Sequence, residues 1–293
     1  MDIESKKFLG QPKNFVSIFN ALLFDGQSVL KPEYLKDENS ELVMNVSSKH
    51  VDIIKRYEDG TYLDLFVIES QSYVDPSMVA RVMEYESVAR MRYIRQNFKK
   101  HVPMHTRLPM ILTVVLYVGE SKWNAAKRLS ELEIIHPGFE DMFNEFKLNL
   151  IELNTNHKYN TGEKATQDFF DLLRMIYRKQ ILKEDLDREF NRDALYFAYV
   201  VTKNKELLNI YQKNEKGDVK VCRALDEMFE ESTNKGIQMG IKQGIEQGVE
   251  RGVKNTQIKI AIKMLVRNNQ TLEEISEIVG LDLNALRELK KSI

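Results

Sequence analysis

The sequence has almost no cysteine, since Cys222 is alone among 293 residues. A single thiol excludes a disulfide within the chain and a zinc site built from several cysteines. No run of about 18 uncharged apolar residues occurs, so we expect no transmembrane helix. Residues 1–7 lack the apolar stretch of a signal peptide, and we therefore expect a cytoplasmic protein.

The chain also lacks a net charge that would attract a polyanion. Its 43 Lys and Arg residues balance 44 Asp and Glu residues, which leaves a formal net charge of −1. Between Arg81 and Arg107, however, seven basic residues accompany only two acidic ones. Such a run is either a solvated helix face or a phosphate-binding surface. On the second interpretation, three arginines are expected to contact DNA phosphates: Arg81, Arg92 and Arg95.

The pattern along the first half predicts an α/β fold. Hydrophobic residues make up 43% of the sequence, enough for an ordinary core, and the length suits one large domain or two. Periodicity and turn signals predict a helix, a β-hairpin, a helix and two strands, over 14–24, 44–72, 75–98, 109–118 and 147–153. This order indicates a mixed sheet flanked by helices.

The second half reads as helical, without strand signals. Helices are expected over 164–182, 184–212 and 218–233, followed by two or three short helices over 255–293. One of these begins at a capping box formed by Thr271 and Glu274. We therefore divide the chain into a sheet domain (1–160), a helical region (161–233), a glycine repeat (234–255) and a small helical tail (256–293).

The predicted hairpin brings two acidic residues together. Asp59-Gly60, flanked by β-formers, is a strong signal for a two-residue turn. Such a turn pairs Asp52 with Val67 and leaves Glu69 one diagonal step away on the same face, roughly 7–8 Å from Asp52. Both carboxylates are then within reach of one Mg²⁺ or Mn²⁺, hard cations that prefer oxygen ligands.

Gln71 is expected on the same face as Glu69, because residues two apart on a strand point the same way. Its amide is suited to orienting an attacking water or a phosphate oxygen, while a bound metal polarises the phosphoryl group. The alternative is structural, with Asp52 pairing with Arg56 or capping a turn. Glu69 ends the apolar run 65–68, and burying an unpaired carboxylate there is costly, which favours a cation.

Sequence segments around the hairpin match a known family. They are 20–26 (NALLFDG), 30–35 (LKPEYL), Asp52, 68–71 (IESQ), 81–85 (RVMEY) and 116–119 (LYVG), with further matches at Met78, Tyr93, Gln96 and Trp123. The chain resembles the PD-(D/E)XK nuclease superfamily and, within it, the recombination-promoting nucleases often labelled putative transposases (the Rpn family). The resemblance spans most of the chain, and its specific part is 14–125.

The resemblance implies a restriction-endonuclease-like core. In it, Asp52 and Glu69 bind a divalent metal, Mg²⁺ or Mn²⁺, and Gln71 occupies the usual lysine position. Such cores often carry a further acidic residue on the first helix, where this sequence has Ser17. The implied function is a metal-dependent DNA endonuclease linked to recombination or mobile elements. The alternatives are a non-catalytic DNA-binding or oligomerising protein with a nuclease-like fold, and a phosphodiesterase that acts on RNA.

Arg81 and Tyr85 lie four residues apart, on one face of the helix after the hairpin. In one interpretation Arg81 contacts phosphate and Tyr85 supports Glu69 or Gln71. In the other, Arg81 forms a salt bridge to Glu84 or Asp75 and Tyr85 belongs to the core.

Glycine recurs every fourth residue from Gly236 to Gly252, each time followed by Ile or Val. Glycine costs roughly 1 kcal/mol relative to alanine inside a helix. The segment is therefore either a flexible linker or a helix that packs closely against a partner, such as a second copy of the chain. In the tail, Asn284, Arg287 and Lys290 follow a faint helix-turn-helix pattern, which indicates either DNA contact or packing within a small bundle.

Overall fold

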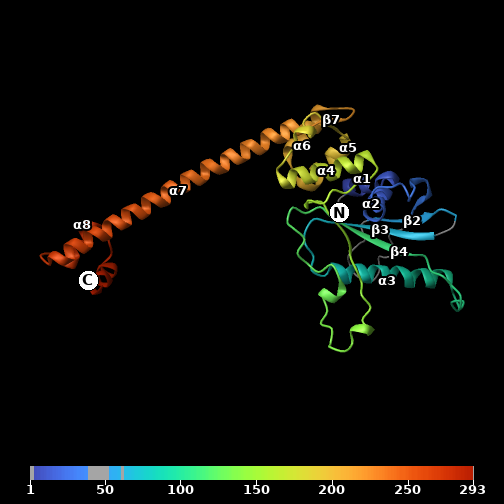
Figure 1. The fold of residues 1–293 in the computed structure, drawn as a ribbon, viewed down its shortest axis with the longest axis horizontal. Helices are drawn as coiled ribbons and strands as arrows, with labels where there is room; N and C mark the ends of the chain where they lie inside the picture. Colours follow the sequence, from blue (N-terminus) through green and yellow to red (C-terminus); the bar gives the residue numbers. More distant parts are fainter. Residues whose placement is uncertain (1–2, 39–52, 61–62, 293) are drawn as a thin grey trace. The chain divides into compact units, whose positions relative to one another are not determined.

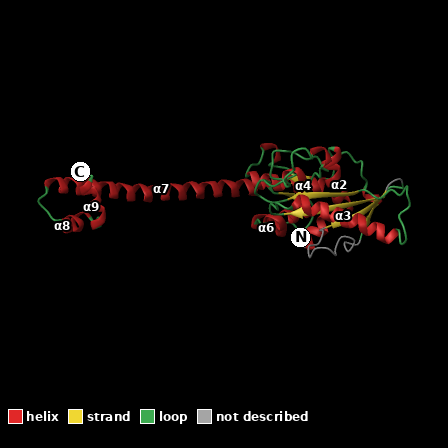
Figure 2. Ribbon diagram, turned by 90° about the horizontal axis from the view of Figure 1, so that it is seen from below, coloured by secondary structure: helices red, strands yellow, loops and turns green. Residues whose placement is uncertain are grey.

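A computed structural model describes residues 3–38, 53–60 and 63–292. The chain forms two compact units, residues 1–226 and 227–293. The first unit contains a five-stranded sheet with helices around it (Figure 1, Figure 2). The described part of the second unit is helical apart from short connections.

The strands of the sheet follow the chain order β1 to β5. They are β1 (Leu35–Asp37), β2 (Ile53–Glu58), β3 (Leu63–Gln71), β4 (Ile111–Tyr117) and β5 (Asn149–Glu152). β2 runs antiparallel to β1 and β3, whereas β3, β4 and β5 are mutually parallel. The predicted α/β fold class, a mixed restriction-endonuclease-like sheet flanked by helices, is therefore confirmed.

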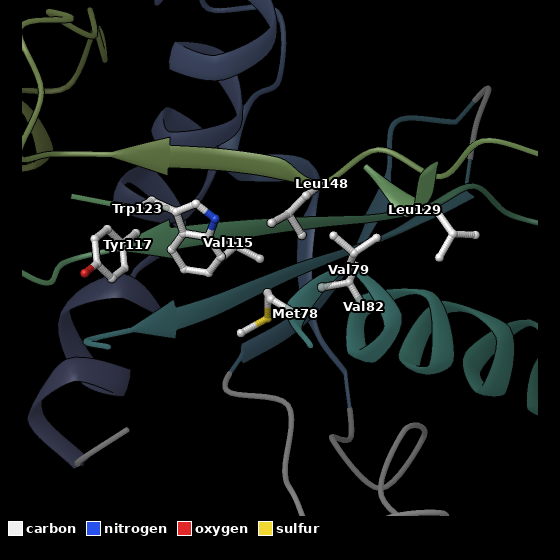
Figure 3. Close-up of a cluster of buried hydrophobic side chains, with 8 residues drawn as sticks. All are labelled: Met78, Val79, Val82, Val115, Tyr117, Trp123, Leu129 and Leu148. Carbon is white, nitrogen blue, oxygen red and sulfur yellow. The ribbon is translucent and has the colours of Figure 1, made fainter. Parts of the chain in front are cut away.

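Helices cover both faces of the sheet. Figure 1 shows α2 (Pro12–Phe24) on one side and α3 (Met78–Asn97) on the other. On the α2 side, the rings of Phe19 and Phe66 lie 4.8 Å apart. On the α3 side, apolar side chains of the helix, of β4 and of the segment after β4 form one buried cluster (Figure 3): Met78, Val79, Val82, Val115, Tyr117, Trp123, Leu129 and Leu148. The central strands are thus buried on both faces.

The hairpin between β2 and β3 forms, but its predicted register is wrong. Val67 pairs with Ile54, whereas a two-residue turn required position 52. The connection between the strands is four residues long, 59–62, and Gly60 adopts a positive φ of 89°. A shift of two residues leaves every side chain on its predicted face. The alternation of apolar residues therefore does not distinguish the two registers, and only the loop length does.

The remaining helices of the first unit are α1 (Ile3–Leu9), α4 (Lys164–Arg178), α5 (Arg192–Thr202) and α6 (Lys205–Lys213). The prediction of one helix over 184–212 is wrong. Lys203 takes a left-handed conformation with φ 56°, and the Asn204 side chain caps α6 by accepting from the Glu206 amide at 3.0 Å. Two short strands that pair with each other also went unpredicted: β6 (Glu189–Phe190), before α5, and β7 (Val219–Lys220), after α6. Two-residue strands are too short for alternation to register.

The long helix α7 (Cys222–Arg267) runs continuously through the glycine repeat, followed by α8 (Leu272–Val279) and α9 (Leu283–Lys291). The predicted capping box at Thr271 and Glu274 is confirmed. The end of α7 packs with α8 and α9 around a small core: Ala261, Leu265, Ile275, Val279 and Leu286. Short 3₁₀ helices are η1 (Pro32–Tyr34), η3 (Leu129–Glu131), η4 (Glu140–Met142) and η5 (Lys183–Asp185). Across the described ranges, no helix combines the length and apolarity that crossing a bilayer requires.

Candidate functional site

Glu69 and Gln71 lie at the C-terminal end of β3, the central strand. They pair with Val115 and Tyr117 of β4, and both are only 4% exposed. They share a sheet face with Val67, which packs against α3. The two residues therefore share one face of the sheet, as predicted, and this is the face that α3 covers.

Arg81 of α3 reaches across to this strand end. Its Nη2 donates to Oε1 of Glu69 at 3.0 Å, and its Nη1 donates to Oδ2 of Asp75 at 2.6 Å. Its Nε and Nη2 also lie 3.1 and 2.8 Å from the hydroxyl of Tyr85, a core residue that is 4% exposed. The structure thus contains the predicted Arg81–Asp75 salt bridge, and Arg81 rather than Tyr85 contacts Glu69.

These contacts favour the ionised forms of Arg81 and Asp75. Burial of Arg81 by itself disfavours its charge, but hydrogen bonds with Tyr85 and Asp75 outweigh burial and raise its pKa. Burial likewise acts against the charge of Asp75, but hydrogen bonds from Ser77 and Arg81 outweigh it and lower the pKa of Asp75. One arginine therefore contacts two carboxylates, those of Glu69 and Asp75.

The predicted metal ligand Asp52 lies outside the described residues. Its neighbour in the sequence, Ile53, pairs with Ile68, the neighbour of Glu69. Within the ranges that the structure describes, no group of three or more His, Cys, Asp or Glu side chains is arranged to hold a metal. The donor chemistry at Glu69 nevertheless suits a hard cation, since a carboxylate and an amide oxygen are the groups on offer.

The amide of Gln71 is enclosed at this strand end. Its Nε2 atom is buried and has no hydrogen-bond partner among the residues described. Buried polar groups in proteins nearly always have a partner, from protein, water or ligand. Gln71 therefore has a donor available for a group beyond the described residues.

Ser17, where related cores carry an acid, faces away from this site. Its Oγ lies 2.8 Å from the Asn14 carbonyl oxygen and 2.8 Å from Oγ1 of Thr166 on α4, and the residue is 3% exposed. It belongs to α2, which covers the sheet face opposite Glu69. An acidic side chain at position 17 would therefore enter the α2–α4 contact.

The basic run after the hairpin divides into two groups. Arg81 and Arg90 are committed to ion pairs, Arg90 with Glu86 at 2.8 Å. Arg95 is exposed and Arg92 half-buried on α3. Neither forms an ion pair with any residue in the described part of the chain, and the same holds for Lys99, Lys100 and Arg107. The exposed group is the portion available to an external anion.

No sequence pattern predicts the contacts that stabilise the turn after β4. The Asn154 side-chain amide donates to the carbonyls of Gly119, Glu120 and Ser121 at 3.1, 3.1 and 2.6 Å. The amide of Val118 donates to the carbonyl of Gln71 at 2.9 Å, so this turn adjoins the candidate site. Contacts between residues more than thirty positions apart leave no local pattern.

A model of a known protein family matches most of the chain. The family model described as "Putative transposase, YhgA-like" matches residues 6–207. The match includes the whole sheet, α2, α3 and the cluster around Glu69. No curated protein and no solved structure shows significant similarity to the chain.

Proposed function

The chain belongs to the family of YhgA-like putative transposases, and from this premise we propose that it is a metal-dependent endonuclease that hydrolyses DNA phosphodiester bonds. Membership of that family agrees with an association with mobile elements. The observation that carries the proposal is the buried carboxylate of Glu69, two residues before Gln71, at the end of the central strand.

In this proposal Asp52 and Glu69 hold Mg²⁺ or Mn²⁺. Asp52 precedes Ile53 and Glu69 follows Ile68, and these two isoleucines are paired across the hairpin. When bound, the metal polarises a phosphoryl oxygen and lowers the pKa of a coordinated water. The carboxylate and amide oxygens that Glu69 and Gln71 place at this strand end support cation binding.

The side chains around the carboxylate have separate roles. Gln71 orients the attacking water or a phosphate oxygen through its amide, whose Nε2 has no partner in the described structure. Arg81 is a positioning residue, because its bond to Oε1 fixes the Glu69 carboxylate. Asp75, with a lowered pKa, in turn fixes Arg81. DNA phosphates outside the cleaved bond contact two arginines of α3, the half-buried Arg92 and the exposed Arg95.

The test is cleavage of supercoiled plasmid by the wild type and by Glu69→Gln, with Mg²⁺ or Mn²⁺ and with a chelator. Removing one metal ligand is expected to lower the cleavage rate at least about 100-fold, as losses of metal ligation or of its supporting contacts do. The matched control is Glu133→Gln, the same change at an exposed carboxylate. Equal nicking by wild type and Glu69→Gln would contradict the proposal, and RNA substrate in parallel tests the alternative sugar.

A second function, self-association through α7, is favoured by the exposed side of that helix. Ile237, Ile241, Ile245, Val249 and Val253 are each between 53% and 61% exposed. Apart from its chain neighbours and the nearby backbone of its own helix, a Cβ added at Gly236, Gly240, Gly244, Gly248 or Gly252 would meet no described atom within 4 Å. Nothing in the described chain therefore requires these glycines.

We propose that a second copy of the chain packs on this stripe. Close approach of helix backbones at small residues offsets the cost of glycine in a helix, roughly 1 kcal/mol each. Sedimentation of wild type and of Ile241→Glu/Ile245→Glu tests it, with Lys242→Glu/Gln243→Glu as the control on the same turns. Wild-type protein that sediments as a monomer at high micromolar concentration would exclude this function.

A further inference from the structure

A cavity of about 300 Å³ lies beside the C-terminal end of α4, and all of its lining residues belong to the first unit. Three segments contribute to its polar lining: the loop after β5, α4 itself and the residues that follow α4. The polar lining residues are Asn156, Lys158, Arg174, Arg178, Gln180 and Asp185. Three of these side chains are cationic and one is anionic, so the cavity offers mostly donors.

The three cations are not neutralised as a group, and two of them, Lys158 and Arg178, are exposed. Arg174 donates to Oδ1 of Asp171 at 2.9 Å, and its side chain is 16% exposed. Arg178, one turn further along α4 and on the same side of the helix, donates to Gln180 at 3.3 Å and to no other side chain within the described ranges. Lys158 forms no ion pair with any residue that the structure describes. The one acid, Asp185, lies 3.7 Å from Arg188.

A structural explanation accounts for only part of this arrangement. Basic residues near a helix C-terminus are stabilised by the helix dipole, which explains Arg178. The dipole does not explain Lys158, which comes from a different segment, nor the two amide side chains that line the same space. Convergence of guanidinium, ammonium and amide donors on one cavity is the chemistry that binds phosphate oxygens.

The cavity is connected to the same strand end as the candidate site. The Tyr177 hydroxyl, next to Arg178, donates to the carbonyl of Val118. The amide of Val118 donates to the carbonyl of Gln71 at 2.9 Å. Two hydrogen bonds thus connect the last turn of α4 to the strand end that carries Glu69.

We propose that this cavity binds a phosphate of the nucleic-acid backbone, outside the bond that is cleaved. This inference rests on the proposed function, because it takes DNA as the ligand. The cavity supplies a second contact point for the duplex, on the α4 side of the strand end, in addition to the arginines of α3. Two backbone contacts separated in this way fix the orientation of a duplex without reading its sequence.

The test measures duplex DNA binding by fluorescence anisotropy in chelator at several salt concentrations. The probe variant is Lys158→Gln/Arg178→Gln, and the control is Lys213→Gln/Lys216→Gln, which removes the same charge from exposed positions outside the cavity. Each lost phosphate contact lowers the slope of log affinity against log salt by about 0.9. The probe variant is expected to lose about 1 to 2 units of that slope, and the control none.

The outcomes separate this inference from the proposed function. Unchanged affinity and slope in the probe variant, with wild-type cleavage intact, overturns the cavity site alone. A reduced slope in the probe variant, together with a wild type that binds DNA but never cleaves it, supports the cavity and contradicts the nuclease. Absence of DNA binding by the wild type at low salt overturns both. If the probe variant binds a free mononucleotide more weakly than the wild type but binds DNA equally well, the cavity is a site for a small phosphate ligand. That result overturns the inference.

Discussion

The C-terminal end of β3 and the long helix α7 depart from ordinary burial in opposite directions. At the end of β3, Glu69 and Arg81 are charged side chains placed inside the fold, with exposures of 4% for Glu69 and 13% for the Arg81 side chain. On α7, Ile241 and Ile245 are apolar side chains left 58% and 61% exposed. Folded chains usually bury apolar groups and expose charged ones.

The difference shows which departures the chain resolves by itself. The buried charges have partners from within the fold, because Arg81 bonds both Glu69 and Asp75. A buried ion pair adds little stability over apolar residues, which agrees with the proposal that the carboxylate binds a cation. The exposed stripe has no partner among the described residues, and such patches mark interaction surfaces. Under the proposed functions, the first region serves chemistry and the second serves association.

Arg81→Ala tests the buried side of this comparison most strongly. It leaves the carboxylates of Glu69 and Asp75 without their counter-ion, and breaking one partner of a buried pair costs about 3–5 kcal/mol. Urea denaturation of the variant measures the loss. The same truncation at Arg92, which lacks an ion pair in the described structure, is expected to change stability by less than about 0.5 kcal/mol. Equal effects of the two would show that Arg81 is not a counter-ion.

Gly119→Ala tests the turn that Asn154 holds beside Gln71. An added Cβ would lie 2.6 Å from the backbone oxygen of Ser72 and 2.5 Å from the Tyr117 hydroxyl. Overpacking of this kind costs about 1–3 kcal/mol, and thermal unfolding measures it. A variant as stable as the wild type would mean that the turn is free to shift.

Gly244→Ala tests the exposed side. Within an isolated helix it is expected to stabilise by roughly 1 kcal/mol, because open space surrounds that position. If a second helix packs there, the same methyl group weakens self-association. Sedimentation and thermal unfolding of Gly244→Ala, beside Gln243→Ala, separate the two effects. Tighter association of Gly244→Ala would contradict close packing at the glycines.

The smallest expected effect is a pH dependence at Asp75. Its pKa is lowered in the fold, since hydrogen bonds from Ser77 and Arg81 outweigh burial. The stability that it contributes is present above its unfolded pKa of about 3.9 and is lost as pH falls through the lower folded pKa. The stability difference between wild type and Asp75→Asn should therefore be constant from neutral pH to about pH 5 and shrink below about pH 4. A difference that stays constant throughout acid denaturation would exclude this account.

Much of the fold was predictable from periodicity, because long elements repeat their apolar positions. The ranges expected for α2, α3, α4, β4 and β5 agree with the structure to within a few residues. The shared face of Glu69 and Gln71 was equally predictable, since it depends only on the two-residue period of a strand.

What remained hidden depends on loop length or on distant contacts. The hairpin register differed by two residues, a shift that preserves every face. The break between α5 and α6 rests on one left-handed residue, Lys203. The contacts of Ser17 with Thr166, and of Asn154 with the turn after β4, join segments with no shared pattern.

The central claim is that Glu69 holds a divalent metal at the end of β3. A crystal soaked in Mn²⁺ and measured at an energy where manganese scatters anomalously tests it directly. The account predicts an anomalous peak between the carboxylates of Asp52 and Glu69, absent from Glu69→Gln crystals. Saturating Mn²⁺ with no peak beside Glu69 would contradict it.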